Sequence, residues 1–312
     1  MNHEEIPILL LGGSSFLGLQ TAETLFYFYD VFCTYNTSYA PNFFPEFNWF
    51  QLDFLNQEKN YFKISLKRLI EKTGAKYIVN FAGISSPMQS RLLPESKTIN
   101  EIANNIITET CSELNVVPIF ISSDHVFNGR EGPYEENNQP NPLKNSVYGN
   151  QKYHAELMYQ KQEKYAILRV STTIGSNFHF QKPNLYVKTL GTLQQKIKKE
   201  IHGATNKIRT ATHCWNVAFA INKIIEGFDQ ERIERGIFHV PGELISEYEL
   251  LKKIASTNNL DPDLIKGLEI SEDDESYPLK LGLESKQTIS TLKGRYLTLE
   301  EGLYQLNYEN QA

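Results

Sequence analysis

Residues 6–18 read Ile-Pro-Ile-Leu-Leu-Leu-Gly-Gly-Ser-Ser-Phe-Leu-Gly, and this stretch decides the fold. The apolar part before the glycines shows no polar alternation, which is typical of a strand covered on both faces of a parallel sheet. The residues from Phe16 to about Phe28 then predict a helix. A glycine turn between a buried strand and a helix can bind a pyrophosphate, because the helix N-terminus offers free N–H groups and a partial positive charge.

The same alternation of strand and helix recurs along the first half of the chain. Strands are expected at residues 30–35, 76–81, 116–122 and 165–170, and helices at 59–72, 96–114 and 146–162. Strands that alternate with helices predict βαβ units with right-handed crossovers. We therefore predict an α/β fold in which residues 1–172 form a Rossmann-type NAD(P)-binding domain with a doubly wound parallel sheet.

After about residue 172 the pattern loosens, and we expect residues 173–312 to form mainly a smaller α+β lobe that binds the substrate. Helices are expected at 184–199, 213–227, 246–257 and 298–306, whereas 261–277 is acidic and irregular. A segment at about 205–240 is expected to pack back on the first domain. Ligands of open α/β sheets bind beyond the carboxyl ends of the strands, so site residues should follow the predicted strands.

Composition and charge exclude several classes of protein. The chain has 312 residues, and its net charge of −6 leaves no basic excess to neutralise nucleic acid or an anionic membrane. The cysteines are widely spaced without a metal-ligand pattern, which favours a reducing compartment. No signal-peptide pattern and no apolar run of about 18 residues is present. We therefore expect a cytoplasmic protein that binds neither metal, membrane nor nucleic acid.

Tyr148-Gly149-Asn150-Gln151-Lys152 places a tyrosine and a lysine on one face of a predicted helix. A tyrosine is a poor acid near neutral pH. A cation one turn away lowers the pKa of the phenol, which can then protonate a carbonyl oxygen or deprotonate an alcohol. Taken alone, this spacing is also frequent in helices without a catalytic role.

A hydroxyl group stands where the apolar strand 116–122 ends, in the stretch Ile121-Ser122-Ser123-Asp124-His125-Val126-Phe127-Asn128-Gly129. Ser123 can donate a hydrogen bond to the same substrate oxygen that faces Tyr148, which would form a small oxyanion site. By itself, such a serine is more often a helix cap or a turn residue.

The glycine turn, the strand-end hydroxyl and the Tyr/Lys pair occur in order on a Rossmann-like pattern. This arrangement resembles the extended short-chain dehydrogenase/reductase superfamily over essentially the whole chain. Residues 79–83 (VNFAG) resemble its NxAG segment, residues 148–156 its YGxxKxxxE motif and residues 167–169 its LR strand. Residues 122–129 (SSDHVFNG) and 278–283 (PLKLGL) resemble the dTDP-4-dehydrorhamnose reductase-like branch, a group of sugar-nucleotide reductases.

The resemblance implies a reaction and a site. Tyr148 would be the general acid, Lys152 would lower its pKa and contact the nicotinamide ribose, and Ser123 would orient the carbonyl. The expected cofactor contacts are Gly12, Ser14, Ser15, Phe16, Leu17, Gly18, Asn36, Thr37, Asp53, Phe54, Phe81, Ala82, Gly83, Tyr148 and Lys152. Reduced nicotinamide would deliver a hydride to the C4 ketone of a nucleotide-linked 4-keto-6-deoxy sugar, with protonation by Tyr148.

Some positions depart from that branch. Ser15 stands where most relatives have a second glycine, His125 replaces the Tyr of STDYVF, and Thr172 stands at a usual Trp. These changes argue against the dTDP-rhamnose substrate itself, but the residues expected for hydride transfer are retained. The weaker candidates for substrate contacts are Ser85, Asp124, His125, Thr172 and Lys280.

The end of strand 30–35 bears on the choice of cofactor. An Asp or Glu there would bind the ribose 2′-hydroxyl and repel a 2′-phosphate. The chain instead has Asn36, Thr37 and Ser38, which can donate hydrogen bonds. We therefore expect NADP(H) to be favoured, with NAD(H) possible.

Alternative functions remain open from the sequence. The dehydratases of this fold carry an Asp-Glu pair where this chain has Asp124-His125, which disfavours dehydration. A sugar-nucleotide epimerase keeps the same Tyr, Lys and Ser/Thr. A non-catalytic NADP-binding regulatory subunit, resembling the methionine adenosyltransferase beta subunit, is the alternative from another class. By analogy with the superfamily, we also consider a homodimer possible.

Overall fold

The first half of the chain alternates strands and helices in a computed structural model, which describes residues 6–37, 44–56, 60–176, 184–195, 199–271 and 278–309. The elements are β1 (Pro7–Leu11), α1 (Phe16–Leu25), β2 (Asp30–Tyr35), β3 (Asn48–Gln51), α3 (Tyr61–Thr73), β4 (Tyr77–Asn80), α4 (Pro87–Leu92), η2 (Thr98–Ile102), α5 (Ala103–Leu114), β5 (Val117–Ser123), η3 (Asp124–Val126), α6 (Val147–Tyr159) and β6 (Tyr165–Val170).

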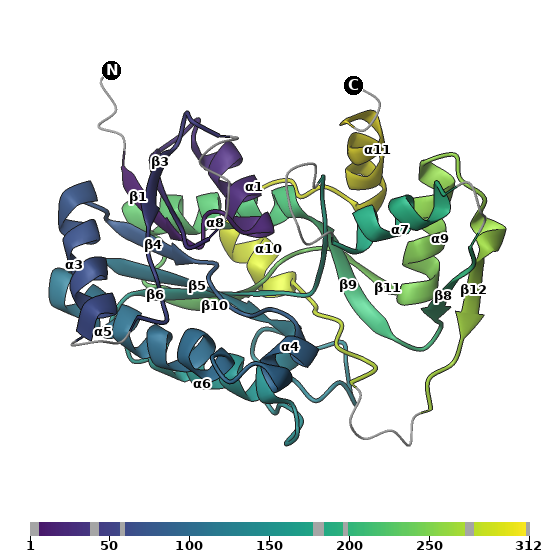
Figure 1. Cartoon of the computed structure of the whole chain (residues 1–312), viewed down its shortest axis with the longest axis horizontal. Helices are drawn as coiled ribbons and strands as arrows, with labels where there is room; N and C mark the ends of the chain where they lie inside the picture. The colour runs from purple at the N-terminus through teal and green to yellow at the C-terminus, as the bar shows by residue number, and fades with distance from the viewer. Residues whose placement is uncertain are drawn as a thin grey trace.

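The second half adds shorter elements. They are β7 (Thr172–Ile174), α7 (Leu185–Leu193), β8 (Ile201–Ala204), β9 (Ile208–His213), α8 (Cys214–Asp229), β10 (Arg235–His239), β11 (Glu243–Ser246), α9 (Glu247–Thr257), η4 (Pro262–Leu264), β12 (Ile265–Leu268), α10 (Lys286–Leu292) and α11 (Leu299–Glu309). Helices α7, α9 and α11 gather with β8, β9, β11 and β12 at one end of the molecule (Figure 1).

A seven-stranded parallel sheet in the order β10-β6-β5-β4-β1-β2-β3 forms the larger part of the fold. The smaller sheets are β11-β9-β7, which mixes parallel and antiparallel pairs, and the parallel pair β12-β8. The predicted α/β class, with a doubly wound sheet and a smaller α+β part, is therefore confirmed. The strand order reverses between β1 and β4, which is where ligands of such sheets bind.

The apolar run of β1 is buried on both faces. Ile8 and Leu10 lie in one hydrophobic core cluster with side chains of α1 and α8, and Leu9 and Leu11 lie in another with α3 and α5. These four side chains are 0% exposed, so the absence of polar alternation reflects burial by helices on both sides. The carboxyl end of β1 is thereby fixed against its neighbours.

Several sequence expectations need correction. The helix expected at 184–199 ends at Leu193, and residues 196–198 lie outside the described ranges. The helix expected at 96–114 is present, but it contains the π-helical turn η2 before α5. Within the segment expected to be irregular, residues 265–268 form β12, which pairs with β8. The pairing partner of β12 is distant in the chain, so local sequence could not indicate it.

We also looked for membrane-spanning helices, metal-ligand clusters and disulfides. In the ranges that the structure describes, no helix is long and apolar enough to cross a membrane, and no cluster of His, Cys, Asp and Glu could hold a metal ion. Cys33, Cys111 and Cys214 are buried free thiols.

Candidate active site

A cavity of about 820 Å³ lies at the carboxyl ends of the central strands, between the large sheet and the C-terminal part. Its lining residues come from the first turn of α1, the loop after β4, helix α4, the end of β5, helix α6, the start of β7 and strand β9. The predicted site residues that line it are Ser15, Phe16, Leu17, Phe81, Gly83, Ser85, Ser123, Asp124, His125, Tyr148, Lys152 and Thr172. The fold therefore brings motifs from distant parts of the chain to one edge of the sheet.

The glycine turn after β1 is packed closely against neighbouring backbone. Gly12 has a φ of +71°, and a Cβ there would lie 2.8 Å from the backbone nitrogen of Ala82. A Cβ on Gly18 would collide with the carbonyl oxygen of Gly12. Glycine is thus required at both positions by the backbone itself. The turn delivers the N-terminus of α1 to the cavity, as a dinucleotide pyrophosphate requires.

Ser15 occupies the position at which most proteins of the resembling family have a second glycine. Its side chain caps α1, because Oγ accepts a hydrogen bond from the N–H of Gly18 at 3.2 Å. Among the described residues, the N–H of Leu17 has no hydrogen-bond acceptor, and Leu17 lies in the first turn of α1 and lines the cavity. The residues present therefore fit an anionic pyrophosphate, with a serine cap in place of glycine.

The loop after β4 is held by an asparagine that the sequence analysis missed. Asn100 lies in η2 and is 2% exposed. Its Nδ2 donates to the carbonyl oxygen of Ile84 at 3.1 Å and to Oε1 of Gln151 at 2.9 Å, and its Oδ1 accepts from the N–H of Ile84. The π-helical turn is the physical signal, since such turns concentrate at functional sites. Asn100 thus joins the loop beside Gly83 to helix α6.

Tyr148 and Lys152 project from α6 into the cavity. Tyr148 is 5% exposed and lies near the Ser123 hydroxyl, which acts on the pKa of the phenol. Lys152 is 8% exposed, and its Nζ donates to the carbonyl oxygen of Ile121 at 2.9 Å. The same Nζ lies 4.6 Å from the centroid of the Phe120 ring and 6.0 Å from that of Tyr148. The Tyr, Lys and Ser of the sequence motifs therefore converge at the end of β5.

Burial dominates the ionisation of this pair. Burial raises the pKa of Tyr148, the nearby Ser123 hydroxyl opposes that shift, and the negative charge of Asp124 adds to it. Burial lowers the pKa of Lys152 to about 8, and the carboxylate of Glu156 opposes this. The pKa of His125 is lowered by burial, against the pull of Asp124. Tyr148 is thus kept protonated, as a proton donor must be.

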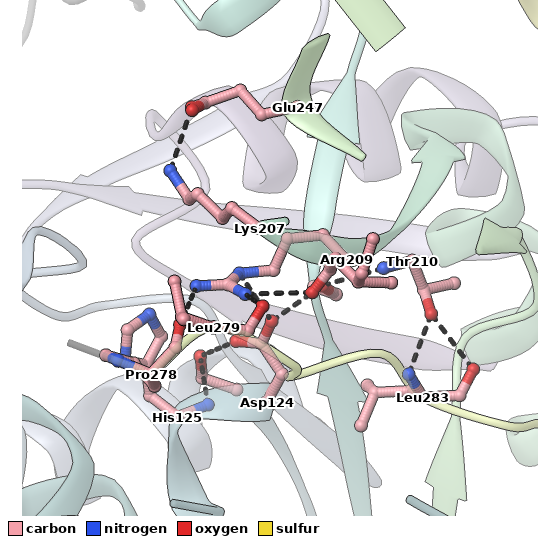
Figure 2. A network of polar contacts seen from close by, with 12 residues as sticks. Asp124, His125, Lys207, Arg209, Thr210, Glu247, Pro278, Leu279 and Leu283 are labelled. Atoms are coloured by element: carbon pink, nitrogen blue, oxygen red, sulfur yellow. Dashed lines mark hydrogen bonds and ion pairs between the residues drawn. The ribbon is translucent and has the colours of Figure 1, made fainter. Parts of the chain in front are cut away.

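Asp124 connects the end of β5 to the C-terminal part. Its Oδ1 accepts from Ser123 Oγ at 3.0 Å, its Oδ2 accepts from Ser171 Oγ at 2.6 Å, and Nε of Arg209 lies 3.8 Å from Oδ2. Figure 2 shows the guanidinium of Arg209 between this carboxylate and the backbone of Pro278 and Leu279.

Other residues of the predicted site lie away from this cavity. Gly12 and Ser14 lie in the turn after β1, and Gly18 lies in α1. Ala82 follows β4 and packs against Gly12, while Asn36 and Thr37 are exposed just after β2. Asp53 forms a turn by accepting from the N–H of Leu55, and Phe54 packs on Phe62 with ring centroids 4.7 Å apart. Lys280 is exposed, whereas its neighbour Pro278 lines the cavity. Ser38 lies outside the described residues.

The cations of the cavity were largely missed by the sequence analysis. Arg91 of α4, together with Lys207 and Arg209 from the region of β9, lines it as Lys152 does. Lys207 pairs with Glu247 at 2.8 Å. Among the described lining residues, Asp124 is the one carboxylate, so cations outnumber anions. No sequence signal marked Lys207 and Arg209, because β9 reaches the site only through its pairing with β7.

Known proteins resemble this chain in sequence and in fold. The family described as RmlD substrate binding domain matches residues 8–295. Methionine adenosyltransferase 2 subunit beta of Xenopus laevis is 27% identical over 199 residues, which are 63% of this chain and 58% of that relative. The chain thus matches less than two thirds of that relative's length.

Solved structures agree on the fold. A dTDP-4-dehydrorhamnose reductase from Bacillus anthracis, in complex with NADP, has a TM-score of 0.79 at 21% identity, covering 98% of this chain and 100% of that one. A UDP-glucose 4-epimerase from Thermotoga maritima, with UDP-glucose, has a TM-score of 0.80 at 19% identity, covering 97% and 98%.

Proposed function

The chain belongs to the RmlD-like family of extended short-chain dehydrogenases/reductases, and from that membership we propose that it is an NAD(P)H-dependent reductase of a nucleotide-linked 4-keto-6-deoxy sugar. One observation carries the proposal. Tyr148, Ser123 and Lys152 line one cavity whose other charged lining residues are mostly cations. Reduction of a keto-sugar requires a proton donor for the carbonyl oxygen. Its diphosphate requires positive charge, which Arg91, Lys207 and Arg209 provide; we call these three residues the cationic wall.

The residues divide the work as follows. When bound, the nicotinamide cofactor supplies the hydride. The N-terminus of α1, with Phe16 and Leu17, would hold the pyrophosphate, and the residues around Gly83 would hold the nicotinamide end. The ammonium of Lys152 would bind the ribose of the cofactor. Tyr148 donates its proton to the sugar carbonyl oxygen as negative charge develops there.

The cationic wall would bind the diphosphate of the substrate. Arg91 and Lys207 line the cavity on the side of α4 and β9. A diphosphate attached to the sugar interacts with such charges, and Arg binds phosphate oxygens through parallel N–H donors. His125 and Thr172 line the same cavity and contact the sugar. The positions at which the chain departs from the reductase branch thus set which sugar fits.

The test is oxidation of NADPH, followed by absorbance, with a panel of nucleotide-linked 4-keto-6-deoxy sugars. Turnover with one member, and its product identified as the 4-hydroxy sugar, is the expected result. NADPH that binds with no turnover on any member would reject the reductase proposal. Non-exchangeable NAD in the purified protein would point instead to an epimerase, which keeps its cofactor through the cycle.

A second candidate is favoured by the curated relatives, which include methionine adenosyltransferase 2 subunit beta from several vertebrates. Their name describes a subunit of another enzyme. In this role the chain would bind NADP and a methionine adenosyltransferase without turnover. Mixing the purified chain with that enzyme from the same cell, followed by gel filtration, tests it. Co-elution as one stoichiometric complex supports the subunit role, and separate elution rejects it.

A further inference from the structure

A ring of hydrogen bonds ties the segment after β4 to helix α6. Its members are Ile84, Ser90, Ser96, Asn100 and Gln151, which we call the buried polar ring. The four polar side chains are between 2% and 4% exposed. Buried polar groups need partners, and a network in which they find them fixes one arrangement of its members.

Backbone groups set the direction of every hydrogen bond in the ring. The N–H of Ile84 can only donate, so the atom of Asn100 that accepts from it at 2.8 Å is Oδ1. Nδ2 of Asn100 then donates to Oε1 of Gln151 at 2.9 Å. Nε2 of Gln151 donates to Oγ of Ser96 at 3.1 Å, and Ser96 donates to the carbonyl oxygen of Ser90 at 2.7 Å. The Ser90 hydroxyl closes the ring on the carbonyl oxygen of Ile84 at 3.0 Å.

Gln151 is the member through which the ring reaches α6. It lies on this helix three residues after Tyr148 and directly before Lys152, whereas the other members all belong to residues 84–100. Turning its amide round would bring two donors together at Asn100, so the side chain has one stable orientation. The ring therefore holds the segment after β4 at a fixed distance from the helix that carries the Tyr/Lys pair.

The segment held in this way forms one wall of the cavity. Its lining residues are Gly83, Ser85, Ser86, Pro87, Met88 and Arg91. Arg91 directly follows Ser90 of the ring and brings an exposed guanidinium to the cavity. Helix α4 has only six residues and is too short to be stable by itself, so its position depends on tertiary contacts such as those of Ser90.

We propose that Gln151 is a positioning residue that sets the place of Arg91 relative to Tyr148, so that Arg91 binds the diphosphate of the substrate while the sugar lies against the phenol. Gln151 acts through Arg91, and it is not among the described residues that line the cavity. The substrate class rests on the proposed function, but the dependence of diphosphate binding on Gln151 can be measured without turnover.

The first test measures diphosphate binding by calorimetry. Uridine diphosphate and thymidine diphosphate are titrated into protein saturated with NADP⁺, so that the pyrophosphate site of the cofactor is already occupied. Gln151→Met keeps the length of the side chain and removes both polar atoms. This variant and Arg91→Ala should each weaken binding by about 10-fold, the size of a lost hydrogen bond to a charged group. Unchanged affinity in Gln151→Met, or a wild type that binds neither diphosphate, would overturn the proposal.

The double variant of Gln151→Met and Arg91→Ala tests whether the effect runs through Arg91. It should bind the diphosphate no more weakly than Arg91→Ala alone, because two changes on one path do not add. Losses that multiply to about 100-fold would show that Gln151 acts on another part of the site, which contradicts the proposal.

A second break in the ring guards against a variant that fails to fold. Ser96→Ala removes the acceptor of Gln151 Nε2 and should weaken diphosphate binding in the same direction, whereas wild-type affinity in this variant would count against the proposal. Asn105→Ala is the matched control, since it removes an exposed amide on α5 that donates to Glu109 at 2.7 Å. It should leave diphosphate affinity unchanged.

Kinetics with the active keto-sugar give a readout that a merely structural role would not produce. Gln151→Met should raise KM by about 10-fold and leave kcat nearly unchanged, because the diphosphate is held equally in the ground state and the transition state. A fall in kcat at constant KM would place the effect on Tyr148 or Lys152 and overturn the proposal. If no keto-sugar is turned over, the proposed function fails, and the diphosphate titrations still decide the role of Gln151.

Discussion

Lys152 donates a hydrogen bond from Nζ to the backbone carbonyl of Ile121, at 2.9 Å. This contact ties the cation of α6 to the end of β5, where Ser123 and Tyr148 also meet. In the protein alone the ammonium thus faces a carbonyl and the Phe120 ring. Any ribose hydroxyl that binds beside Tyr148 comes within reach of a cation that is already in place.

Cofactor affinity should depend on pH through Lys152. Burial lowers the pKa of this lysine to about 8, so the ammonium is charged below pH 8 and neutral well above it. A contact that needs the charge is therefore complete at low pH and is lost as pH rises through about 8. Calorimetric titration should show NADPH affinity falling above that pH in the wild type. In Lys152→Met the affinity should be weaker and nearly flat across the same range.

The alkaline limb of activity should move upward when Lys152 is removed. A positive charge beside a phenol favours the phenolate, so its loss raises the pKa of Tyr148. Because reduction needs the protonated phenol, Lys152→Ala should stay active to higher pH, although at a lower maximum rate. Measured kcat against pH checks this. An unchanged limb counts against coupling between the two residues, and a limb moved downward contradicts it.

NADPH should bind more tightly than NADH. Strand β2 ends at Tyr35, and the exposed residues Asn36 and Thr37 that follow carry no negative charge. Asn36→Asp adds a charge at nearly constant size and should reduce the preference for NADPH by about 10-fold through repulsion of the 2′-phosphate. Asn36→Ala, which removes the amide without adding charge, is the matched control. Titrations that give NADH the lower Kd in the wild type would refute the preference.

A buried ion pair beneath the site should dominate local stability. Arg169 binds Glu156 through Nε and Nη2 at 2.9 and 2.8 Å, and both side chains are 0% exposed. Glu156→Gln leaves the guanidinium buried without its counter-charge and should lower the free energy of unfolding by about 3–5 kcal/mol. Urea denaturation measures this.

The exposed pair of Glu243 and Lys253, at 2.7 Å, offers the control for that experiment. Glu243→Gln should cost less than about 1 kcal/mol, because water screens the pair. Equal losses in the two variants would mean that burial does not amplify the interaction between Glu156 and Arg169.

The strands of the large sheet were predictable where burial on both faces made them continuously apolar. Residues 30–35 and 165–170 form β2 and β6 with the expected bounds. The strand β3, Asn48–Gln51, was missed because it is short and lies at the sheet edge, where its side chains are partly exposed. The strands of the smaller sheets were missed for a related reason, since their pairing depends on partners far away in the chain.

The candidate site was predictable as far as it follows strand ends and helix starts. Ser123 is the last residue of β5 and Tyr148 lies in the first turn of α6, so both lie at the edge of the sheet where ligands of doubly wound folds bind. Arg209 reaches Asp124 only because β9 pairs with β7, and no local pattern encodes that pairing. The roles assigned to the predicted site residues stay predictions until variants are measured.

The most direct measurement compares NADPH oxidation by the wild type and Tyr148→Phe on the same nucleotide-linked 4-keto-6-deoxy sugar, with NADPH binding measured for both. The account predicts turnover by the wild type and a loss of kcat of about 100-fold or more in the variant, the range for a positioned acid, with cofactor affinity nearly unchanged. Near-native turnover by Tyr148→Phe would contradict the account, as would a wild type that binds NADPH and reduces no member of the panel.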